Sequence, residues 1–317
     1  MRVRPVPLLA AAVLAGGGLV AAAPAPHATV TVSTASQLKS ALAAAEPGDT
    51  IQLADAVYPG NFTATTPGTA AAPITLTGSS RAVLTASGGY GLHLDGASYW
   101  QVHGITVTGG QKGIVLDSAT HVTLDSVTVH GLQMEGVHFR RSSGDGVIEN
   151  SRIYDTGRDR PGYGEGVYVG TAGDLTDRSD QVRILDNTIG PAVRAENVDI
   201  KEGTTGGLIA GNSFDGSGLS DANYDDSWVD VKGNGWTVRD NTGVHTLNDG
   251  FQVHAVAPDW GCGTVFTGNH ADLTGATGAD RYAIDVTDYS AACPVTIGAG
   301  NTVTGGRGLV DPGVPVG

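Results

Sequence analysis

The 317-residue sequence predicts an all-β solenoid, a right-handed parallel β-helix, because two short phrases recur along it. The first phrase starts with a small or aromatic residue and then alternates apolar and variable positions, as a strand with one buried face does. Its eight occurrences start 22 to 33 residues apart, at Gly91–Asp95, Gly113–Asp117, Gly136–Arg140, Gly166–Gly170, Asn197–Lys201, Trp228–Lys232, Gly250–His254 and Ala283–Thr287. This period is typical of a solenoid, whose coils bury their apolar sides only against neighbouring coils.

The second phrase places an asparagine at one turn of each coil. We expect its members at Asn150, Asn187, Asn212, Asn241, Asn269 and Asn301. Such asparagines can stack as a ladder whose amides bond the coils above and below, and asparagine tolerates the left-handed backbone of a tight turn. A β-sandwich of short strands is the alternative, but sandwiches do not keep one register over eight strands.

The chain is expected to divide into a leader and one domain. Residues 1–28 combine Arg2 and Arg4 with a short apolar stretch and small residues, the pattern of a secretion signal; a retained N-terminal anchor is the alternative. Residues 29–317 would form the β-helix domain of a secreted protein.

The ends of this domain are expected to differ from its middle. Thr34 and Gln37 have capping-box spacing, which predicts a short amphipathic helix across the open end of the stack. Residues 54–90 are expected to be irregular, and the Gly- and Pro-rich chain beyond Thr304 is expected to fray.

Composition limits the class of partner. The net charge of −14 argues against nucleic acid, whose binding proteins usually carry a basic surface. Beyond the leader no apolar stretch approaches the length of a membrane span, so we expect a soluble monomer that does not enter membranes. Cys262 and Cys293 lie in neighbouring coils, and in an exported protein they predict a disulfide.

Charged and aromatic residues gather on the exposed face of the central coils. Equivalent positions of successive coils should form columns with a spacing of about 4.8 Å. We expect catalytic groups at Lys201, Lys232, Arg140, His254 and Tyr168. We expect substrate-binding groups at His138, Asp199, Asp230, Gln252 and Trp228. The alternative is a mixed surface on which lysines and aspartates merely pair with one another.

A third column, just before the strand phrase, is acidic. It contains Glu135, Glu165 and Glu196. Carboxylates about 4.8 Å apart repel one another unless a cation lies among them. Three arginines could pair with them: Arg140, Arg141 and Arg194. The other solution, which we favour, is a divalent cation bound by the three glutamates, and Ca²⁺ is the usual ion for an all-oxygen site outside cells.

These groups suit proton abstraction beside a uronate carboxylate. Because each cation disfavours protonation of its neighbours, we expect Lys201 to have a lowered pKa and to act as the base. Ca²⁺ or arginine would neutralise the carboxylate and so stabilise a carbanion-like transition state. His254 or Tyr168 would protonate the leaving oxygen. The predicted reaction is β-elimination of an acidic polysaccharide.

Two stretches resemble a known family. Pro47–Leu53 and the rung Val198–Lys201 are similar to secreted β-helix polysaccharide lyases of the alginate lyase and chondroitinase B family, polysaccharide lyase family six. The resemblance implies an alginate-like substrate, with Lys201 in the place of the base and Glu196 in that of a Ca²⁺ ligand. The chain departs from that family at two positions. The family has an arginine in the place of Lys232 and an acidic ligand in the place of Arg194.

Other functions remain open. Asp199 and Asp230 on adjacent coils could form the carboxylate pair of a β-helix glycoside hydrolase, although the lysines between them disfavour a general acid. A uronate epimerase would share the proton-abstraction step. A non-catalytic carbohydrate-binding protein would need only the surface.

Overall fold

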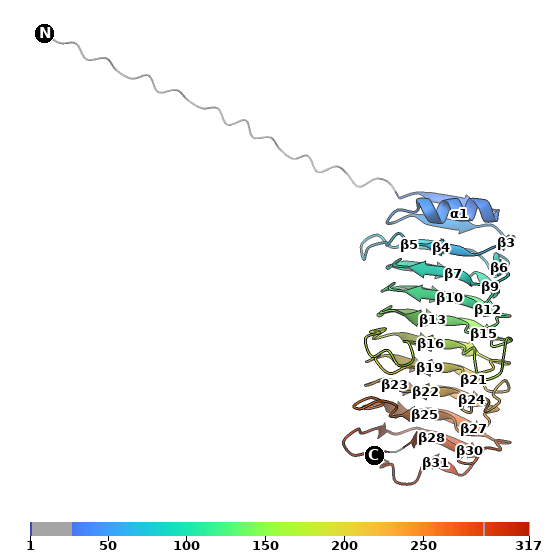
Figure 1. Cartoon of the computed structure of the whole chain (residues 1–317), viewed down its shortest axis with the longest axis vertical. Helices are drawn as coiled ribbons and strands as arrows, with labels where there is room; N and C mark the ends of the chain where they lie inside the picture. The colour runs from blue at the N-terminus through green and yellow to red at the C-terminus, as the bar shows by residue number, and fades with distance from the viewer. Residues whose placement is uncertain (2–26, 288, 317) are drawn as a thin grey trace.

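The computed structural model describes residue 1, residues 27–287 and residues 289–316, and it is a right-handed parallel β-helix of about ten turns (Figure 1). Each full coil contributes one strand to each of three parallel sheets, called A, B and C here, in that order along the chain. The predicted fold class is therefore confirmed. The predicted signal peptide falls almost entirely on residues outside the described part of the chain.

Sheets A and B form two sides of the solenoid. Sheet A contains β1 (Thr29–Val32), β2 (Thr50–Leu53), β5 (Ile74–Thr77), β8 (Trp100–His103), β11 (Thr123–Asp125), β14 (Val147–Glu149), β17 (Arg183–Leu185), β20 (Leu208–Ala210), β23 (Thr237–Arg239), β26 (Val265–Thr267) and β29 (Thr296–Ile297). Sheet B contains β3 (Val57–Pro59), β6 (Val83–Ala86), β9 (Thr106–Gly109), β12 (Thr128–His130), β15 (Arg152–Tyr154), β18 (Thr188–Ile189), β21 (Ser213–Asp215), β24 (Thr242–Val244), β27 (His270–Leu273) and β30 (Thr302–Gly305).

Sheet C contains the strand phrase and faces the viewer in Figure 1. Its strands are β4 (Phe62–Ala64), β7 (Tyr90–Asp95), β10 (Lys112–Asp117), β13 (Val137–Arg140), β16 (Val167–Val169), β19 (Val198–Ile200), β22 (Val229–Val231), β25 (Phe251–His254), β28 (Tyr282–Thr287) and β31 (Gly308–Val310). Tyr168 lies opposite Asp199, Asp199 opposite Asp230, and Asp230 opposite Gln252. The predicted columns are confirmed, and β4 and β31 are the two strands of this sheet that the phrase did not predict.

Alternation decides which side chains form the core. In β19, Val198 and Ile200 point inward and are fully buried against the equivalent residues of neighbouring coils, which leaves Asp199 on the outer side of the sheet. Trp228 starts the next occurrence of the phrase but is also fully buried, and its indole N–H donates to the carbonyl of Val244 at 3.0 Å. The prediction that Trp228 binds substrate is therefore wrong, because its ring fills the interior.

The asparagine ladder runs along the inside of one turn. It joins Asn187, Asn212, Asn241, Asn269 and Asn301, and each member after the first accepts a hydrogen bond on its side-chain oxygen from the side-chain amide of the preceding one. Asn150 is not a member: Ile148 pairs with Ile184, so Asn150 lies one position too early and is exposed. Ser151 occupies the ladder position instead, and its backbone N–H donates to Asn187 at 2.9 Å.

Both ends of the solenoid are more regular than predicted. The helix α1 (Ala35–Ala44) starts after Thr34 with the predicted capping box and buries Leu38 and Leu42 over the first coil. Four strands, β3 to β6, lie within residues 54–90, so the prediction of an irregular segment is wrong. The prediction of a frayed end beyond Thr304 is also wrong, because β31 pairs with β28.

Two further predictions concern covalent structure and membranes. The Cys262–Cys293 disulfide is present and joins two neighbouring coils, with the Cα atoms 4.7 Å apart. Among the described residues, no helix has both the length and the apolar character that crossing a membrane requires.

Candidate active site

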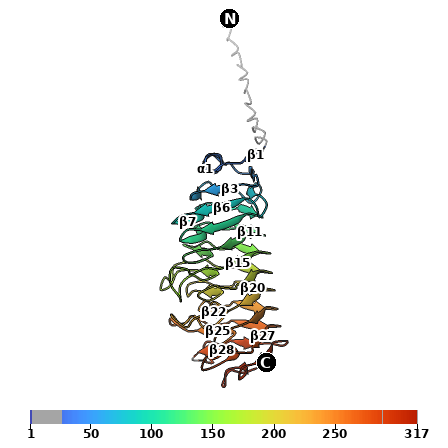
Figure 2. The same ribbon diagram turned by 90° about the vertical axis from the view of Figure 1, so that its right-hand side faces the viewer.

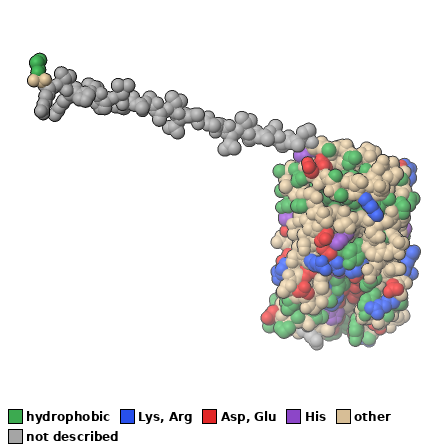
Figure 3. All heavy atoms as spheres, turned by 45° about the horizontal axis from the view of Figure 1, so that its top comes forward, with side chains coloured by type: hydrophobic (Ala, Val, Ile, Leu, Met, Phe, Trp, Pro, Cys, Tyr) green, Lys and Arg blue, Asp and Glu red, His purple; other side chains and the backbone are tan. Residues whose placement is uncertain are grey.

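A cleft of about 450 Å³ lies on the outer face of sheet C, over the central coils. It is lined by Glu165, Glu196, Asp199, Lys201, Asn223, Tyr224, Asp230, Lys232, His254 and Val256. Acidic, basic and histidine side chains gather on this face in Figure 3, and loops of the central coils stand out beyond the strands in Figure 2. Seven of the lining residues were singled out from the sequence, whereas Asn223, Tyr224 and Val256 lie in loops outside the repeat and were missed.

The floor of the cleft is a chain of ion pairs. Lys201 Nζ lies 2.5 Å from Asp199 Oδ2, and Lys232 Nζ lies 3.0 Å from Asp199 Oδ1 and also contacts Asp230. Asp230 in turn bonds His254, with 2.7 Å between Oδ1 and Nδ1. Asp199 and Asp230 are buried, and their carboxylates hold the cations in position.

Both lysines remain protonated in this setting. Burial disfavours the charge of Lys201, but the attraction and hydrogen bond of Asp199, with Asp230 and Glu196 nearby, outweigh burial and raise its pKa. The pKa of Lys232 is raised in the same way: burial is outweighed by Asp199 and Asp230. The predicted lowering of the lysine pKa is therefore wrong, because aspartates on the same rungs separate the two cations.

Two glutamates stand beside this chain without a cation of their own. The carboxylates of Glu165, Glu196 and Asp199 lie within 4.8 Å of one another. Burial, followed by repulsion from Asp199 and Glu135, raises the pKa of Glu165 to about 8, and burial and Asp199 raise the pKa of Glu196 well above its usual range. Within the described residues, the Glu196 carboxylate receives no hydrogen bond. When all four carboxylates are ionised they outnumber the two ammonium groups, and a divalent cation bound among them would supply the missing positive charge.

Glu135 does not complete this acidic group. Its Oε1 lies 3.0 Å from Lys112 Nζ, and both residues are buried one coil away. The three arginines do not neutralise the glutamates either, because they bond aspartates on other rungs: Arg140 and Arg141 meet Asp117, and Arg194 meets Asp155. Of the two solutions considered for the acidic column, the arginine solution is wrong.

Tyr168 is half-buried on the coil before the cleft-lining Asp199 and contacts Lys201. The lysine Nζ is 5.1 Å from the ring centroid, a cation–π contact. Burial, with Asp199 and Glu165 nearby, raises the tyrosine pKa far above its usual range, so the phenol keeps its proton. Within the described residues the phenol oxygen has no hydrogen-bond partner, which leaves it free for a substrate oxygen.

His138 supports Tyr168 from the preceding coil. The two rings meet edge to face with centroids 4.5 Å apart. Because Nε2 lies 2.9 Å from the carbonyl of Gly170, it carries the proton and donates, while Nδ1 accepts from the Lys112 ammonium at 3.1 Å. Burial and Lys112 lower the pKa of His138 well below its usual range. The ring is buried and neutral, so it does not reach substrate as predicted.

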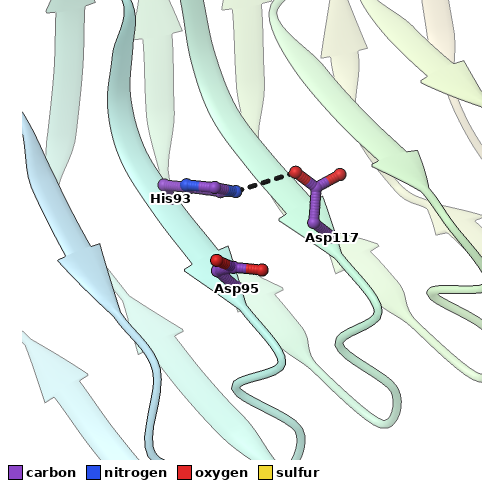
Figure 4. Close-up of side chains that lie close together, drawn as sticks. All are labelled: His93, Asp95 and Asp117. Carbon is purple, nitrogen blue, oxygen red and sulfur yellow. Dashed lines mark hydrogen bonds and ion pairs between the residues drawn. The ribbon is translucent and has the colours of Figure 1, made fainter.

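Arg140 lies two coils from Lys201 and belongs to a second cluster. Its Nε is 2.5 Å from Asp117 Oδ1, and a terminal nitrogen bonds the Tyr90 hydroxyl at 3.0 Å. Figure 4 shows that His93 also points at Asp117, with Asp95 beside them; the His93 Nε2 to Asp117 Oδ2 distance is 2.9 Å. Arg140 thus extends the charged face but does not touch the residues of the cleft floor.

Gln252 also does not have the substrate-binding role predicted for it. Its side chain is buried and its amide nitrogen donates to Asp226 at 2.8 Å and Asp249 at 3.1 Å. Its carbonyl oxygen accepts from Ser227 at 3.1 Å. The residue therefore stabilises the coil below the cleft and has no free group for substrate.

Comparison with known proteins places the chain among β-helix proteins. The family model described as "right handed beta helix region" matches residues 90–310. The solved structure of an alginate lyase from Paenibacillus sp. strain FPU-7 is 38% identical over 90% of this chain and 99% of that one, with a TM-score of 0.83. A search of curated protein sequences found no match.

More distant structures share the fold alone. A pectate lyase is 15% identical over 86% of this chain and 70% of its own, with a TM-score of 0.66. An alginate lyase of polysaccharide lyase family six is 16% identical over 87% of this chain but 40% of its own, with a TM-score of 0.62. At these identities the likeness carries no residue roles.

Proposed function

The chain belongs to the right-handed β-helix family and is a polysaccharide lyase of the alginate lyase type, and from this premise we propose that it is secreted and cleaves alginate-like uronate polymers by β-elimination in the sheet C cleft. The observation that carries the proposal is the contact between Lys201 and Tyr168 on adjacent coils. Beside them lies the acidic group of Glu165, Glu196 and Asp199. Base, acid and carboxylate-neutralising groups are the three parts that this reaction needs.

We assign the proton transfers to Lys201 and Tyr168. Lys201, in its neutral form, takes the proton from the carbon beside the uronate carboxyl group. Tyr168 donates its phenolic proton to the glycosidic oxygen on the neighbouring carbon. The carbon–oxygen bond breaks, a carbon–carbon double bond forms within the uronate ring, and no water is consumed. His254 is the alternative donor, because Asp230 outweighs the effect of burial and raises the pKa of His254, which favours its protonated form.

Glu165, Glu196 and Asp199 are the residues that would hold a Ca²⁺ ion. They fit because all three offer oxygen ligands, and because Glu196 is buried without a partner among the described residues. A cation bound there would neutralise the substrate carboxylate and lower the pKa of Lys201. Lys232, whose ammonium lies between Asp199 and Asp230, would supply a second positive charge for the carboxylate.

The proposal is tested by incubating the purified protein with a panel of uronate polymers, with and without EDTA. Polymannuronate, polyguluronate, pectate and chondroitin sulfate cover the relevant ring stereochemistries. Unsaturated uronate, followed by its ultraviolet absorbance, supports the lyase. New reducing ends without that absorbance identify a hydrolase, inversion at the carbon beside the carboxyl group identifies an epimerase, and binding without turnover identifies a carbohydrate-binding protein. Each of these three results overturns the proposal.

A further inference from the structure

We propose that Tyr224 is a sugar-binding residue whose ring packs against the apolar face of a pyranose at the rim of the active-site cleft. Tyr224 lines the cleft beside Asn223, in the segment between β21 and β22 (residues 216–228). The inference rests on the proposed function, because it names a further binding contact for the same polysaccharide. In this inference the loop contributes to the affinity for the polysaccharide, and Lys201 and Tyr168 carry out the proton transfers.

The ring of Tyr224 is unusually open to water. It is 85% exposed, whereas every other tyrosine among the described residues is buried or half-buried. A tyrosine ring can bury 150–250 Å² of surface, so leaving it in water forgoes a substantial apolar contribution. An exposed aromatic ring beside a cleft is therefore a contact surface for a ligand that brings its own apolar face.

The backbone of this loop holds the ring where it is. Tyr224 has a φ of 63°, in the left-handed region that a bulky residue rarely adopts and that costs about 1–3 kcal/mol. The neighbouring Asp225 is fully buried and accepts from the backbone N–H groups of Ser220 at 2.9 Å and Asn223 at 3.2 Å. These bonds close the loop and offset the cost of the left-handed turn at its tip.

A second anchor ties the loop to the preceding coil. The side-chain amide of Asn223 donates to the carbonyl of Gly162 at 3.1 Å, and Gly162 lies in the segment between β15 and β16. The two loops are thus joined by a hydrogen bond. This bond holds the turn that carries Tyr224 in place beside the cleft.

The distribution of polarity in the cleft matches a uronate sugar. Seven of the ten residues that line the cleft are acidic, basic or histidine residues, and the apolar side chains among them are those of Tyr224 and Val256. A pyranose ring is polar at its edge and apolar on its C–H faces, and a uronate adds a carboxylate at the edge. Such a ring can direct its carboxylate at Lys232 while one face covers the tyrosine.

Because the contact is made equally in the ground state and the transition state, its loss should act on KM. The test measures kcat and KM of the whole protein, in the presence of Ca²⁺, on the best polymer of the panel. Tyr224→Ala should raise KM about tenfold with kcat unchanged, and Tyr224→Phe should restore the wild-type KM because the ring is sufficient. Tyr224→Asn serves as a second ring-free variant, since asparagine tolerates the left-handed turn and keeps the loop folded.

Tyr99→Ala is the matched control. Tyr99 also has a left-handed φ, of 58°, but stacks on His121 in a turn outside the cleft, so its loss should leave KM unchanged. An unchanged KM in both ring-free variants overturns the inference, and so does a Phe variant as weak as Ala, which would assign the effect to the hydroxyl. A wild-type protein that turns over no uronate polymer overturns the proposed function instead, and the two failures are thereby distinguished.

Discussion

Lys201 Nζ and Asp199 Oδ2 lie 2.5 Å apart, so two outward residues of one rung form a buried ion pair at the centre of the cleft. The pair explains why Lys201 is charged in the free protein and why its side chain is only 13% exposed. It also fixes the ammonium group above the ring of Tyr168.

Replacing Lys201 by alanine should lower kcat by about 10²–10⁴-fold, the usual contribution of a general acid or base. Circular dichroism should show an unchanged fold, because Asp199 keeps its ion pair with Lys232 in the variant. Lys39→Ala is the control, since Lys39 is an exposed lysine on α1, remote from the cleft. Wild-type turnover by the Lys201 variant would remove it from the mechanism.

Tyr168→Phe should lower kcat by a similar factor with little change in thermal stability. The substitution removes only the phenol oxygen, which has no hydrogen-bond partner among the described residues, and it keeps the ring contacts with His138 and Lys201. Steady-state kinetics and thermal unfolding check the two parts separately. If Tyr168→Phe keeps its activity while His254→Gln loses it, His254 is the proton donor.

Ca²⁺ should raise the melting temperature, because an ion that binds only the folded state stabilises it by about 2.7 kcal/mol at a concentration 100 times its Kd. Glu196→Gln should abolish this shift by removing a ligand. Glu149→Gln, in sheet A on another side of the solenoid, should keep it. A calcium-induced shift that survives in the Glu196 variant would place the ion elsewhere.

The acidic group should also make stability depend on pH when EDTA is present. The pKa of Glu165 is about 8 in the folded protein and 4.5 ordinarily, so the folded state holds this proton more tightly than the unfolded chain does. Its contribution to stability is therefore complete below pH 4.5 and is lost as the pH rises through about 8.

The Glu165→Gln variant isolates this contribution, since it keeps the shape of the side chain and removes the titration. Thermal unfolding across the pH range should show a wild-type melting temperature that falls by several degrees relative to the variant between these two pKa values. Parallel curves for the two proteins would show that Glu165 titrates normally.

The asparagine ladder gives a stability prediction with an internal control. Asn241 accepts from Asn212 and donates to the carbonyl of Ile209 and to Asn269, so Asn241→Ala leaves several buried polar groups unpaired. We expect a loss of about 3 kcal/mol or more in the free energy of unfolding. Asn150→Ala, off the ladder and exposed, should cost far less in the same denaturant titration. Equal losses would contradict the ladder.

The sequence predicted the columns of sheet C well because strand alternation and coil stacking are both periodic. Tyr168, Asp199 and Asp230 fall opposite one another as the phrase required. The same reasoning failed where periodicity carries no information. It could not tell that Trp228 turns inward, nor that the second phrase slips by one residue at Asn150, because both depend on how a turn enters its strand.

The pKa values of the site residues and the positions of loop residues also could not be predicted from the sequence. Adjacent cations suggested a lowered pKa for Lys201, but the sequence does not give the distances that let Asp199 dominate. The partner of Glu135 is Lys112 on the preceding coil, whereas only arginines were considered for that role from the sequence. Tyr224 gave no periodic signal, and an aromatic residue within a polar loop is the only hint that the sequence offers.

The register of sheet C also bears on how such proteins can change over evolution. Each residue of a column comes from a separate stretch of chain, and its direction is set by the rung that holds it and not by the total number of rungs. Duplication or loss of a gene segment encoding one whole turn would therefore lengthen or shorten the exposed face of sheet C. The side chains of the remaining turns would keep their direction. Insertions inside a turn would instead grow as outward loops, as the segment bearing Tyr224 does.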